Sequence, residues 1–598
     1  MFSATDVANF LACHHLLALD RAEARGEIKK PLFYDPGIEL LRELGPRHER
    51  AYLHHLSDSQ GIEIVRVSNS IPLVEAVACT LDALRCGVSV IYQATFQNGL
   101  WHGRSDFLIR VEKPSALGSH SYEVVETKLA RSTKAEALIQ LCFYSDLLSQ
   151  IQNVQPDWMH VVLGGTNPER YAVEQYIAYF RRIKCDFDAA CQNTVSTYPE
   201  PTEHCGICSW DPACDKRRHT DDHLSLVAGI TRNQRKVLVS QDVSTVTRLA
   251  QLELSEKSKI DGIGNPALQR IRQQAHLQVK GKEQGHLIYE LLEITEPDTG
   301  LAALPAPSPG DVFLDLEGEP YAFETGLEYL FGVLTLPEGA AAEPSYESLW
   351  SFDRAEEKGT FEKFITKIME RWNRHPDMHI YHYAPYEPTA IKRLAGQHAI
   401  CMDEIDQLLR AGIFVDLYRI VRQGVRASVE SYSIKKMEPL YGFKWVASAR
   451  DSVVALQTFS ATLALGCAHD ARVKTELLVA IEAYNRDDCL SAWRLRGWLE
   501  DLRLELEAKI ANTLPRPAKK QSEPSEKLSA QTEQVRAVMA RLLAGVPAEE
   551  TEWTSEHRAL WLLAQMLEYR RREDKSAWWE YFRQCELSDD ELFEDRNA

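Results

Sequence analysis

The amino-acid sequence predicts a multidomain α/β protein with a helical middle segment and a helical tail. The chain has 598 residues, more than one hydrophobic core usually serves, so three or more domains are expected. Short β-rich runs mix with helical patterns in two separate regions, as is typical of α/β domains. Two stretches rich in Pro and in small or charged residues, LAALPAPSPG and PRPAKKQSEPSEK, are typical of linkers.

These features divide the chain into five parts. They are an α/β domain (1–220), a helical segment (221–300), a second α/β domain (301–505), a linker (506–527) and a helical C-terminal segment (528–598).

The first domain is expected to begin with helices over residues 1–60. Ser3 and Asp6 form an S-x-x-D capping box ahead of an apolar series there. Five β-rich runs follow before residue 165, and a helix over roughly 132–149 interrupts them.

Composition and charge place the protein in an ordinary globular class. It is 44% hydrophobic and 26% charged, and no apolar run approaches the roughly 18 residues that span a bilayer. The N-terminus MFSATDVANF lacks the basic region of a signal peptide, so a cytoplasmic location is predicted. The net charge of −19 argues against an indiscriminate nucleic-acid coat, although it allows a local basic channel.

Carboxylates in the first domain have the spacing of a metal site. Glu126 and Lys128 are two residues apart in a strand and therefore face the same side. Asp106, at the end of another strand, can join Glu126 in holding Mg²⁺ or Mn²⁺. Such a cation lowers the pKa of a bound water and clamps a scissile phosphate.

Four other residues fit around this pair of carboxylates. Lys128 can steady the attacking water or the charge that develops on the phosphate. Gln140 and Tyr144 are four residues apart on a helix and share a face. His48 can add a ligand through a neutral imidazole nitrogen.

Four fragments carry a resemblance to a known family, and they occur in the order GPRH (45–48), GRSD (103–106), ETK (126–128) and QLCFY (140–144). Residues 1–220 resemble the RecB-like branch of the PD-(D/E)xK nucleases, which have a restriction-endonuclease-like core, and are close to AddB and the CRISPR-associated iron–sulfur exonucleases. The resemblance implies His48, Asp106, Glu126 and Lys128 as the catalytic set, supported by Gln140 and Tyr144. The alternative is a degenerate core that only binds.

A cysteine cluster, EHCGICSWDPAC (203–214), closes the first domain. In a reducing compartment such a cluster indicates a metal site. The resemblance implies that Cys13 joins Cys205, Cys208 and Cys214 to bind a [4Fe–4S] cluster, which staples the N-terminal helix to the far end of the core. The alternative is a zinc site of four thiolates, or of three thiolates and an imidazole from His14, His15 or His204.

The second α/β domain opens on DVFLDLEGEP, in which Asp315 and Glu317 are again two residues apart on a strand. Two carboxylates on one face at a strand end suit a pair of Mg²⁺ ions. Glu387 follows Tyr386 at the start of a helix. Tyr484 and Asp488 lie four residues apart on one face of a later helix.

This series of motifs resembles the DEDDy exonucleases, which have an RNase H-like fold. The resemblance implies that Asp315, Glu317, Glu387 and Asp488 hold the metals, that Tyr484 orients the attacking water, and that polarity is 3′→5′. The second motif departs from the family, because His382 and Glu387 stand where Asn and Asp are usual. Asp416 fits a supporting position of the family, and we expect its role to be structural.

The helical segment contains a Gly-x-Gly turn, IDGIGNPAL, between basic helices. Two interpretations of this segment are possible: a helix-hairpin-helix-like clamp that holds phosphates, and a plain helical spacer. The clamp would use five basic residues: Arg232, Arg235, Lys236, Arg270 and Arg272.

The order of the parts resembles the bacterial RecB-like nuclease family, whose members often continue into a superfamily 1 helicase. This chain contains no G-x4-G-K-[ST] loop, and its end at DRNA is compatible with a helicase domain or subunit that follows. The resulting hypothesis is a metal-dependent DNA nuclease with two centres, acting as an exonuclease on single strands or ends in DNA repair or anti-phage defence. The alternatives are an RNase H-like core that only binds nucleic acid or a partner protein, and a nuclease for RNA.

Overall fold

The computed structural model of the protein describes every residue except 32–35, 60, 129–132, 164–167, 193–196, 254–259, 295, 321, 323–325, 337–343, 447–454, 457–458, 460–462, 464–470, 520–525, 586, 588–591 and 593–598. The chain forms two compact units. The first unit comprises Met1–Val279, Glu319–Gly326 and Val453–Leu477, and the second comprises Lys280–Gly318, Leu327–Ser452 and Leu478–Ala598. The predicted end at DRNA lies outside the described residues.

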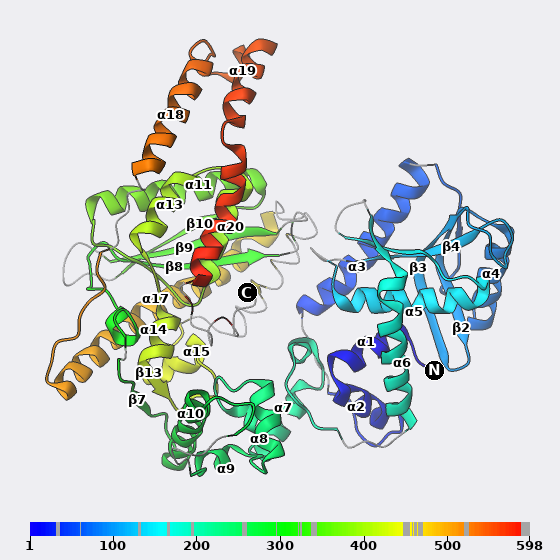
Figure 1. Ribbon diagram of the computed structural model, residues 1–598, viewed down its shortest axis with the longest axis horizontal. Helices are drawn as coiled ribbons and strands as arrows, with labels where there is room; N and C mark the ends of the chain where they lie inside the picture. The colour runs from blue at the N-terminus through cyan, green and yellow to red at the C-terminus, as the bar shows by residue number, and fades with distance from the viewer. Residues whose placement is uncertain are drawn as a thin grey trace. The chain divides into compact units, whose positions relative to one another are not determined.

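A six-stranded mixed sheet forms the centre of the first unit, with its strands in sequence order from β1 to β6 (Figure 1). β1 and β2 pair in parallel, as do β4 and β5, and the other neighbours are antiparallel. The strands are β1 (Ile64–Arg66), β2 (Val90–Asn98), β3 (Trp101–Val111), β4 (Ser121–Thr127), β5 (Trp158–Val162) and β6 (Pro168–Ala172). Each parallel pair needs a crossover helix, and these are α4 (Leu73–Cys86) and α5 (Ala135–Gln152).

Helices cover both faces of this sheet. Apolar side chains of α1 (Ala4–Ala12), α4, α5 and α6 (Ile177–Gln192) pack on one face, while α3 (Pro36–His54) packs on the other. α2 (His14–Ala24) follows α1 directly. The predicted capping box at Ser3 and Asp6 is present at the start of α1.

The helical segment of the first unit has a small apolar core of its own. The segment contains α8 (Arg232–Ser240), α9 (Val246–Ala250) and the first part of α10 (Asn265–Gln284), and α7 (Asp211–Thr220) precedes it. After α10 the chain enters β7 (Tyr289–Leu291), which pairs with β13 (Val425–Ala427) in the second unit. This short strand was not predicted.

The second unit has a five-stranded sheet in the order β10-β9-β8-β11-β12. β8 and β12 both pair in parallel with β11, and β9 and β10 pair antiparallel. The strands are β8 (Val312–Glu319), β9 (Leu327–Thr335), β10 (Ser345–Trp350), β11 (Ile380–His382) and β12 (Phe414–Asp416).

Helices α11 (Arg354–Arg374), α12 (Tyr386–His398) and α13 (Met402–Ala411) cover one face of that sheet with an apolar core. The long helix α17 (Ala471–Ile510) contacts the sheet through Cys489, whose sulfur donates to the carbonyl of Gly332 on β9 at 3.6 Å. α11 and α17 lie on opposite sides of the sheet (Figure 1). α17 extends into the segment predicted as a linker.

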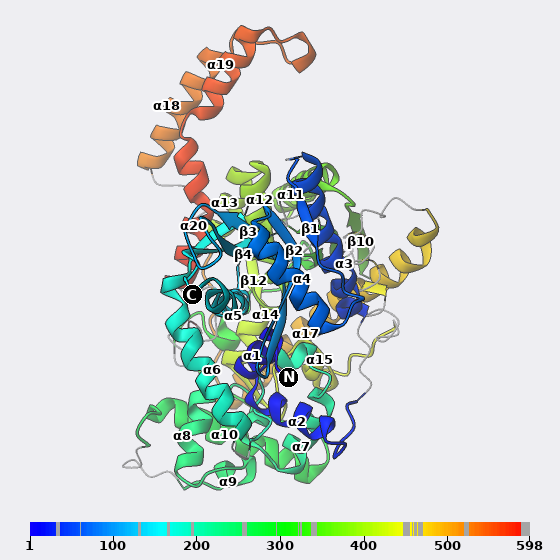
Figure 2. The same cartoon turned by 90° about the vertical axis from the view of Figure 1, so that its right-hand side faces the viewer.

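The C-terminal part is helical, as predicted, with α18 (Glu526–Leu543), α19 (Ser555–Met566) and α20 (Tyr569–Cys585). α18 and α19 lie side by side in both views (Figures 1 and 2). Within the second unit α20 packs on α12, and Trp579 is buried in the core beside the sheet and donates to Asp406 at 3.0 Å. Among the described residues, no helix is long and apolar enough to cross a membrane.

Candidate functional site

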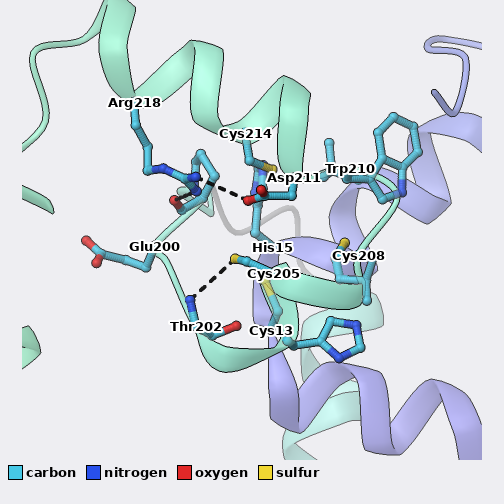
Figure 3. A pocket seen from close by; sticks show the side chains of 14 residues that line it. Cys13, His15, Glu200, Thr202, Cys205, Cys208, Trp210, Asp211, Cys214 and Arg218 are labelled. Atoms are coloured by element: carbon cyan, nitrogen blue, oxygen red, sulfur yellow. Dashed lines mark hydrogen bonds and ion pairs between the residues drawn. The ribbon is translucent and has the colours of Figure 1, made fainter. Parts of the chain in front are cut away.

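Four cysteines from two distant parts of the chain line one pocket in the first unit. Cys13 lies between α1 and α2, and Cys205, Cys208 and Cys214 lie just before and within α7. Figure 3 shows their side chains converging on this pocket. Burial is the main cause that raises the pKa of Cys214 to about 11, and the nearby thiols add to the effect.

A backbone amide donates to one of these sulfur atoms, because the Thr202 amide lies 3.4 Å from Cys205 Sγ. Burial raises the pKa of the Cys208 thiol, and the Trp210 backbone opposes this shift. Such hydrogen bonds favour thiolates and tune iron–sulfur clusters. Among the residues that the structure describes, no three of the four sulfur atoms lie mutually within 4.8 Å.

The three histidines near the pocket have different surroundings. His15 and His204 line the pocket, but His15 Nδ1 is already 2.7 Å from the hydroxyl of Thr197. His14 stacks on Phe10 with ring centroids 4.2 Å apart.

The carboxylates of Asp106 and Glu126 meet where β3 and β4 stop pairing. The register of these strands ends at Phe107 opposite Val125, one residue before the two carboxylates. Beyond this point, backbone amides of the two strands donate to these carboxylates and not to carbonyl oxygens of the neighbouring strand. The Asp106 amide donates to Glu126 Oε1 at 3.1 Å, and the Thr127 amide donates to Asp106 Oδ2 at 2.8 Å.

Glu126 is the most buried carboxylate of this site, with 1% of its surface exposed. Burial, followed by the charge of Asp106, raises its pKa to about 8. The ammonium of Lys128 lies 3.3 Å from Glu126 Oε2 and opposes this shift. A buried acid beside a second carboxylate and a lysine is a suitable environment for a divalent cation.

Tyr144 of α5 reaches the same site. Burial, followed by the Glu126 charge, raises the pKa of its phenol, and Gln140 and the Arg104 backbone oppose this shift. Gly103 makes this approach possible, because a Cβ atom there would lie 2.7 Å from the Tyr144 ring. The glycine of the GRSD fragment therefore has a packing role.

His48 and its neighbour Glu49 lie at the edge of this site on α3. His48 Nε2 is 3.1 Å from the carbonyl oxygen of Val162, an arrangement that leaves Nδ1 for another partner. In the described part of the chain, His48, Asp106 and Glu126 do not place ligand atoms mutually within 4.8 Å. Burial, followed by the charge of Asp106, raises the pKa of Glu49; the sequence interpretation missed this carboxylate.

A tighter carboxylate group lies in the second unit. Asp315 and Glu317 alternate with buried leucines on β8, and α17 brings Asp488 to them. One ligand oxygen from each lies within 4.8 Å of the others, and this is the one such group of three among the described residues. Hard divalent cations prefer this set of carboxylate oxygens.

Burial and mutual repulsion strongly affect the protonation of these three groups. Burial, then the charge of Asp488, raises the pKa of Glu317 to about 8. The pKa of Asp488 rises to about 7, and that of Asp315 rises well above its usual range. In each case burial is the largest cause. A divalent cation would offset this repulsion and allow all three groups to ionise.

Glu387 lies beside this group at the start of α12 and is buried. Its Oε2 atom has no hydrogen-bond partner among the described residues and lies 3.8 Å from His382 Nδ1. The charges of Glu317 and Asp488 both act on it. A buried oxygen without a donor requires an explanation, and a cation ligand provides one.

His382, which stands where the DEDDy exonucleases usually have Asn, makes contacts within the turn that follows β11. His382 Nδ1 is 2.7 Å from the carbonyl of Ala384, and the Ala384 amide donates to Asp416 at 2.9 Å. These contacts hold Ala384 at φ +73°, a region that is unfavourable for residues other than glycine. Asp416 also caps α14 (Leu417–Gly424) through the Tyr418 amide, so its contacts are structural.

Tyr484 is buried on the same face of α17 as Asp488. Its hydroxyl contacts the ammonium of Lys435, a residue of α15 (Ile434–Met437). The neighbouring Asp487 is also buried, but it accepts from the Val446 amide at 2.8 Å and so anchors a loop.

Residues 312–500 match the RNase H superfamily. The matched region contains all five residues predicted for the second centre, which are Asp315, Glu317, Glu387, Tyr484 and Asp488. An RNase H-like domain indicates a nuclease that acts on nucleic acid. No curated protein matches the chain significantly.

Within the RNase H-like domain, the sequence interpretation missed a chain of hydrogen bonds behind Asp315. Asn485 donates to Asp315 Oδ2 at 2.6 Å, and Tyr346 donates to Asn485 Oδ1 at 2.7 Å. Gly332 leaves the space, because a Cβ atom there would lie 1.6 Å from Asn485 Oδ1. The position of Asn485, one residue after Tyr484, is the available sequence signal.

A phosphate clamp, one of the two possibilities that the sequence left open for the helical segment, does not suit Arg235. This side chain is buried and pairs with Glu200 at 2.9 Å. Arg272 also donates inward, to the Leu252 carbonyl at 3.0 Å. These two side chains stabilise the segment itself.

Proposed function

We propose that the chain is a metal-dependent nuclease with two separate phosphodiester-hydrolysing centres, acting as an exonuclease on single-stranded DNA or DNA ends. The observation that carries the proposal is the group of Asp315, Glu317 and Asp488, with oxygens within 4.8 Å of one another in an RNase H-like domain. The buried Oε2 atom of Glu387 extends this group. These contacts favour an active centre over a core that only binds.

The RecB-like resemblance of residues 1–220 and the surroundings of Glu126 support the other centre. Asp106, Glu126 and Lys128 meet there in a buried site. Divalent cations bound at the two centres would supply an activated water and positive charge for the phosphate. Lys128 would add charge beside the first centre, and Tyr484 would orient water in the second. A superfamily 1 helicase acting on the same DNA in repair or anti-phage defence is the partner that this resemblance favours.

The geometry of the four cysteines favours an iron–sulfur cluster over zinc. Tetrahedral zinc with Zn–S bonds of about 2.3 Å holds its sulfur atoms about 3.8 Å apart. The thiols around this pocket are spread more widely, since no three of them lie within 4.8 Å in the described chain. A larger cluster is consistent with this wider spread and with the N–H···S hydrogen bond to Cys205. It would join the N-terminal helices to the region before α7.

Cluster content is tested on protein purified without oxygen. We expect a brown protein with absorbance near roughly 400 nm, bound iron and sulfide, and loss of all three signals in Cys208→Ala. Cys79→Ala, at an exposed cysteine, is the matched control. A colourless protein with stoichiometric zinc would overturn the cluster assignment.

Nuclease activity is tested on 5′- and 3′-labelled single- and double-stranded DNA with Mn²⁺, beside RNA of matched sequence. We expect Asp315→Asn and Glu126→Gln each to remove part of the cleavage, and the double variant to remove all of it. Glu347→Gln and Glu169→Gln, at exposed positions, are the controls. Digestion of DNA that is unchanged in both single variants and in the double variant would refute the proposal, and cleavage of RNA alone would replace DNA as substrate.

A further inference from the structure

Lys435 brings a positive charge to the acidic centre of the RNase H-like domain. Its ammonium lies over the ring of Tyr484, 4.6 Å from the centroid, and 5.1 Å from that of Trp445. The Tyr484 hydroxyl that it contacts lies one helical turn from Asp488 on the same face of α17, so the ammonium is a neighbour of the carboxylate group. None of the motifs in the sequence pointed to this residue.

The contact with Tyr484 has a defined direction. A lysine ammonium can donate hydrogen bonds but cannot accept them, so the Tyr484 oxygen accepts from Lys435. The phenol hydrogen must then point to another acceptor. Tyr484 and Asp488 lie one turn apart on the same face of α17, so this hydrogen is available to a water bound at the carboxylate group.

We propose that Lys435 is a positioning residue of this centre. It fixes Tyr484 as a hydrogen-bond donor toward the attacking water, and its resident charge weakens cation binding at the three carboxylates. This inference rests on the proposed nuclease function. In the reaction, the water oxygen bonds to phosphorus, the P–O bond to the neighbouring nucleoside breaks, and one proton of the water ends on the departing oxygen.

The inference predicts opposite effects on two measured quantities. Loss of the ammonium leaves Tyr484 free to turn its hydrogen elsewhere, so cleavage slows. It also removes a repulsive charge near the carboxylates, so the cation binds more tightly. If Lys435 only stabilised the packing of Trp445 and Tyr484, its replacement would lower both the cleavage rate and the affinity for the cation.

The experiment uses the full chain with Glu126→Gln, so that the RNase H-like centre is the one observed. Lys435→Met is compared with Lys435→Arg, Tyr484→Phe and the Lys435→Met/Tyr484→Phe double variant. Lys436→Met, on the same short helix and exposed, is the control. Mn²⁺ affinity is measured from the electron paramagnetic resonance signal of free Mn²⁺, and single-turnover cleavage is measured on end-labelled single-stranded DNA.

We expect Lys435→Met to slow single-turnover cleavage about tenfold or more and to strengthen Mn²⁺ binding, and Lys435→Arg to restore part of the rate. The double variant should cleave no more slowly than Tyr484→Phe, because Lys435 acts through that phenol. Weaker or unchanged Mn²⁺ binding, or independent losses that multiply in the double variant, would overturn the inference. If the Glu126→Gln parent cleaves no DNA, the nuclease proposal fails for this centre, and so does the orienting role of Lys435. The difference in Mn²⁺ affinity between the parent and Lys435→Met then tests the effect of the lysine charge by itself.

Discussion

Asn485 holds Asp315 through a hydrogen bond of 2.6 Å between its amide nitrogen and Oδ2 of the carboxylate. Tyr346 fixes the orientation of the amide from behind, because its hydroxyl donates to Asn485 Oδ1. The carboxylate oxygen that accepts from Asn485 is thereby held in place, and the other is left for a cation.

Replacing Asn485 should separate this role from metal ligation. In Asn485→Leu the partly buried hydroxyl of Tyr346 loses its acceptor, which costs about 1 kcal/mol of unfolding free energy. We expect that loss in urea denaturation, together with slower cleavage by the RNase H-like centre. Asn373→Leu, on an exposed position of α11, should leave the cleavage rate unchanged. Parent-like cleavage by Asn485→Leu would show that Asp315 does not need this support.

Gly332 offers a steric test of the same contact. Alanine at this position would place its Cβ atom 1.6 Å from Asn485 Oδ1, so Asn485 or the strand must move. We expect Gly332→Ala to lower the melting temperature and to slow cleavage. Gly359→Ala, on an exposed turn of α11 with no atom near the added Cβ, should instead stabilise the helix by up to about 1 kcal/mol.

Gly103 provides the corresponding test in the first unit. A Cβ atom there would meet the Tyr144 ring at 2.7 Å and displace it from Glu126. Cleavage that depends on Glu126 should therefore fall in Gly103→Ala while the RNase H-like centre stays active. Gly99→Ser, at a nearby turn with φ +58° and open space, controls for a general loss of stability. Equal losses at both centres would contradict a local effect.

The raised pKa values predict how stability depends on pH without metal. Glu126 and Glu317 have pKa values of about 8 in the folded protein, above the usual 4.5. Between these values the folded state keeps a proton that the unfolded chain has lost, so stability falls as pH rises. Above pH 8 the fall should level off.

Denaturation in EDTA at several pH values from 5 to 9 measures this fall. Mn²⁺ should flatten it, because bound carboxylates are already ionised, and Glu126→Gln should remove part of it. Identical curves with and without Mn²⁺ would indicate that neither site binds the cation.

The predictable part of the site consists of residues whose spacing alone defines a shared face. Glu126 with Lys128, and Asp315 with Glu317, follow from strand alternation, and Tyr484 with Asp488 follows from the helical repeat. The resemblance added partners from distant segments, such as Cys13 and Glu387, which no local pattern connects.

The remaining features depend on contacts between distant elements. Asn485 meets Gly332 because α17 crosses β9, and Lys435 meets Tyr484 because α15 packs near α17. The spacing of residues along the sequence does not predict where two distant elements cross. The role of Arg235 stayed open in the sequence for the same reason, since a basic residue before a glycine turn gives no sign of its partner Glu200.

Glu200 connects the cysteine pocket to the helical segment that follows it. It lies on the pocket wall and pairs with His223 and Arg235, which lower its pKa to about 2. One small region thus gathers the start of the chain, the stretch ahead of α7 and the base of α8. During synthesis Cys13 leaves the ribosome long before the other three cysteines, so the pocket contacts of the N-terminal helices can form only after Cys214 has been translated, and those of Glu200 only after Arg235.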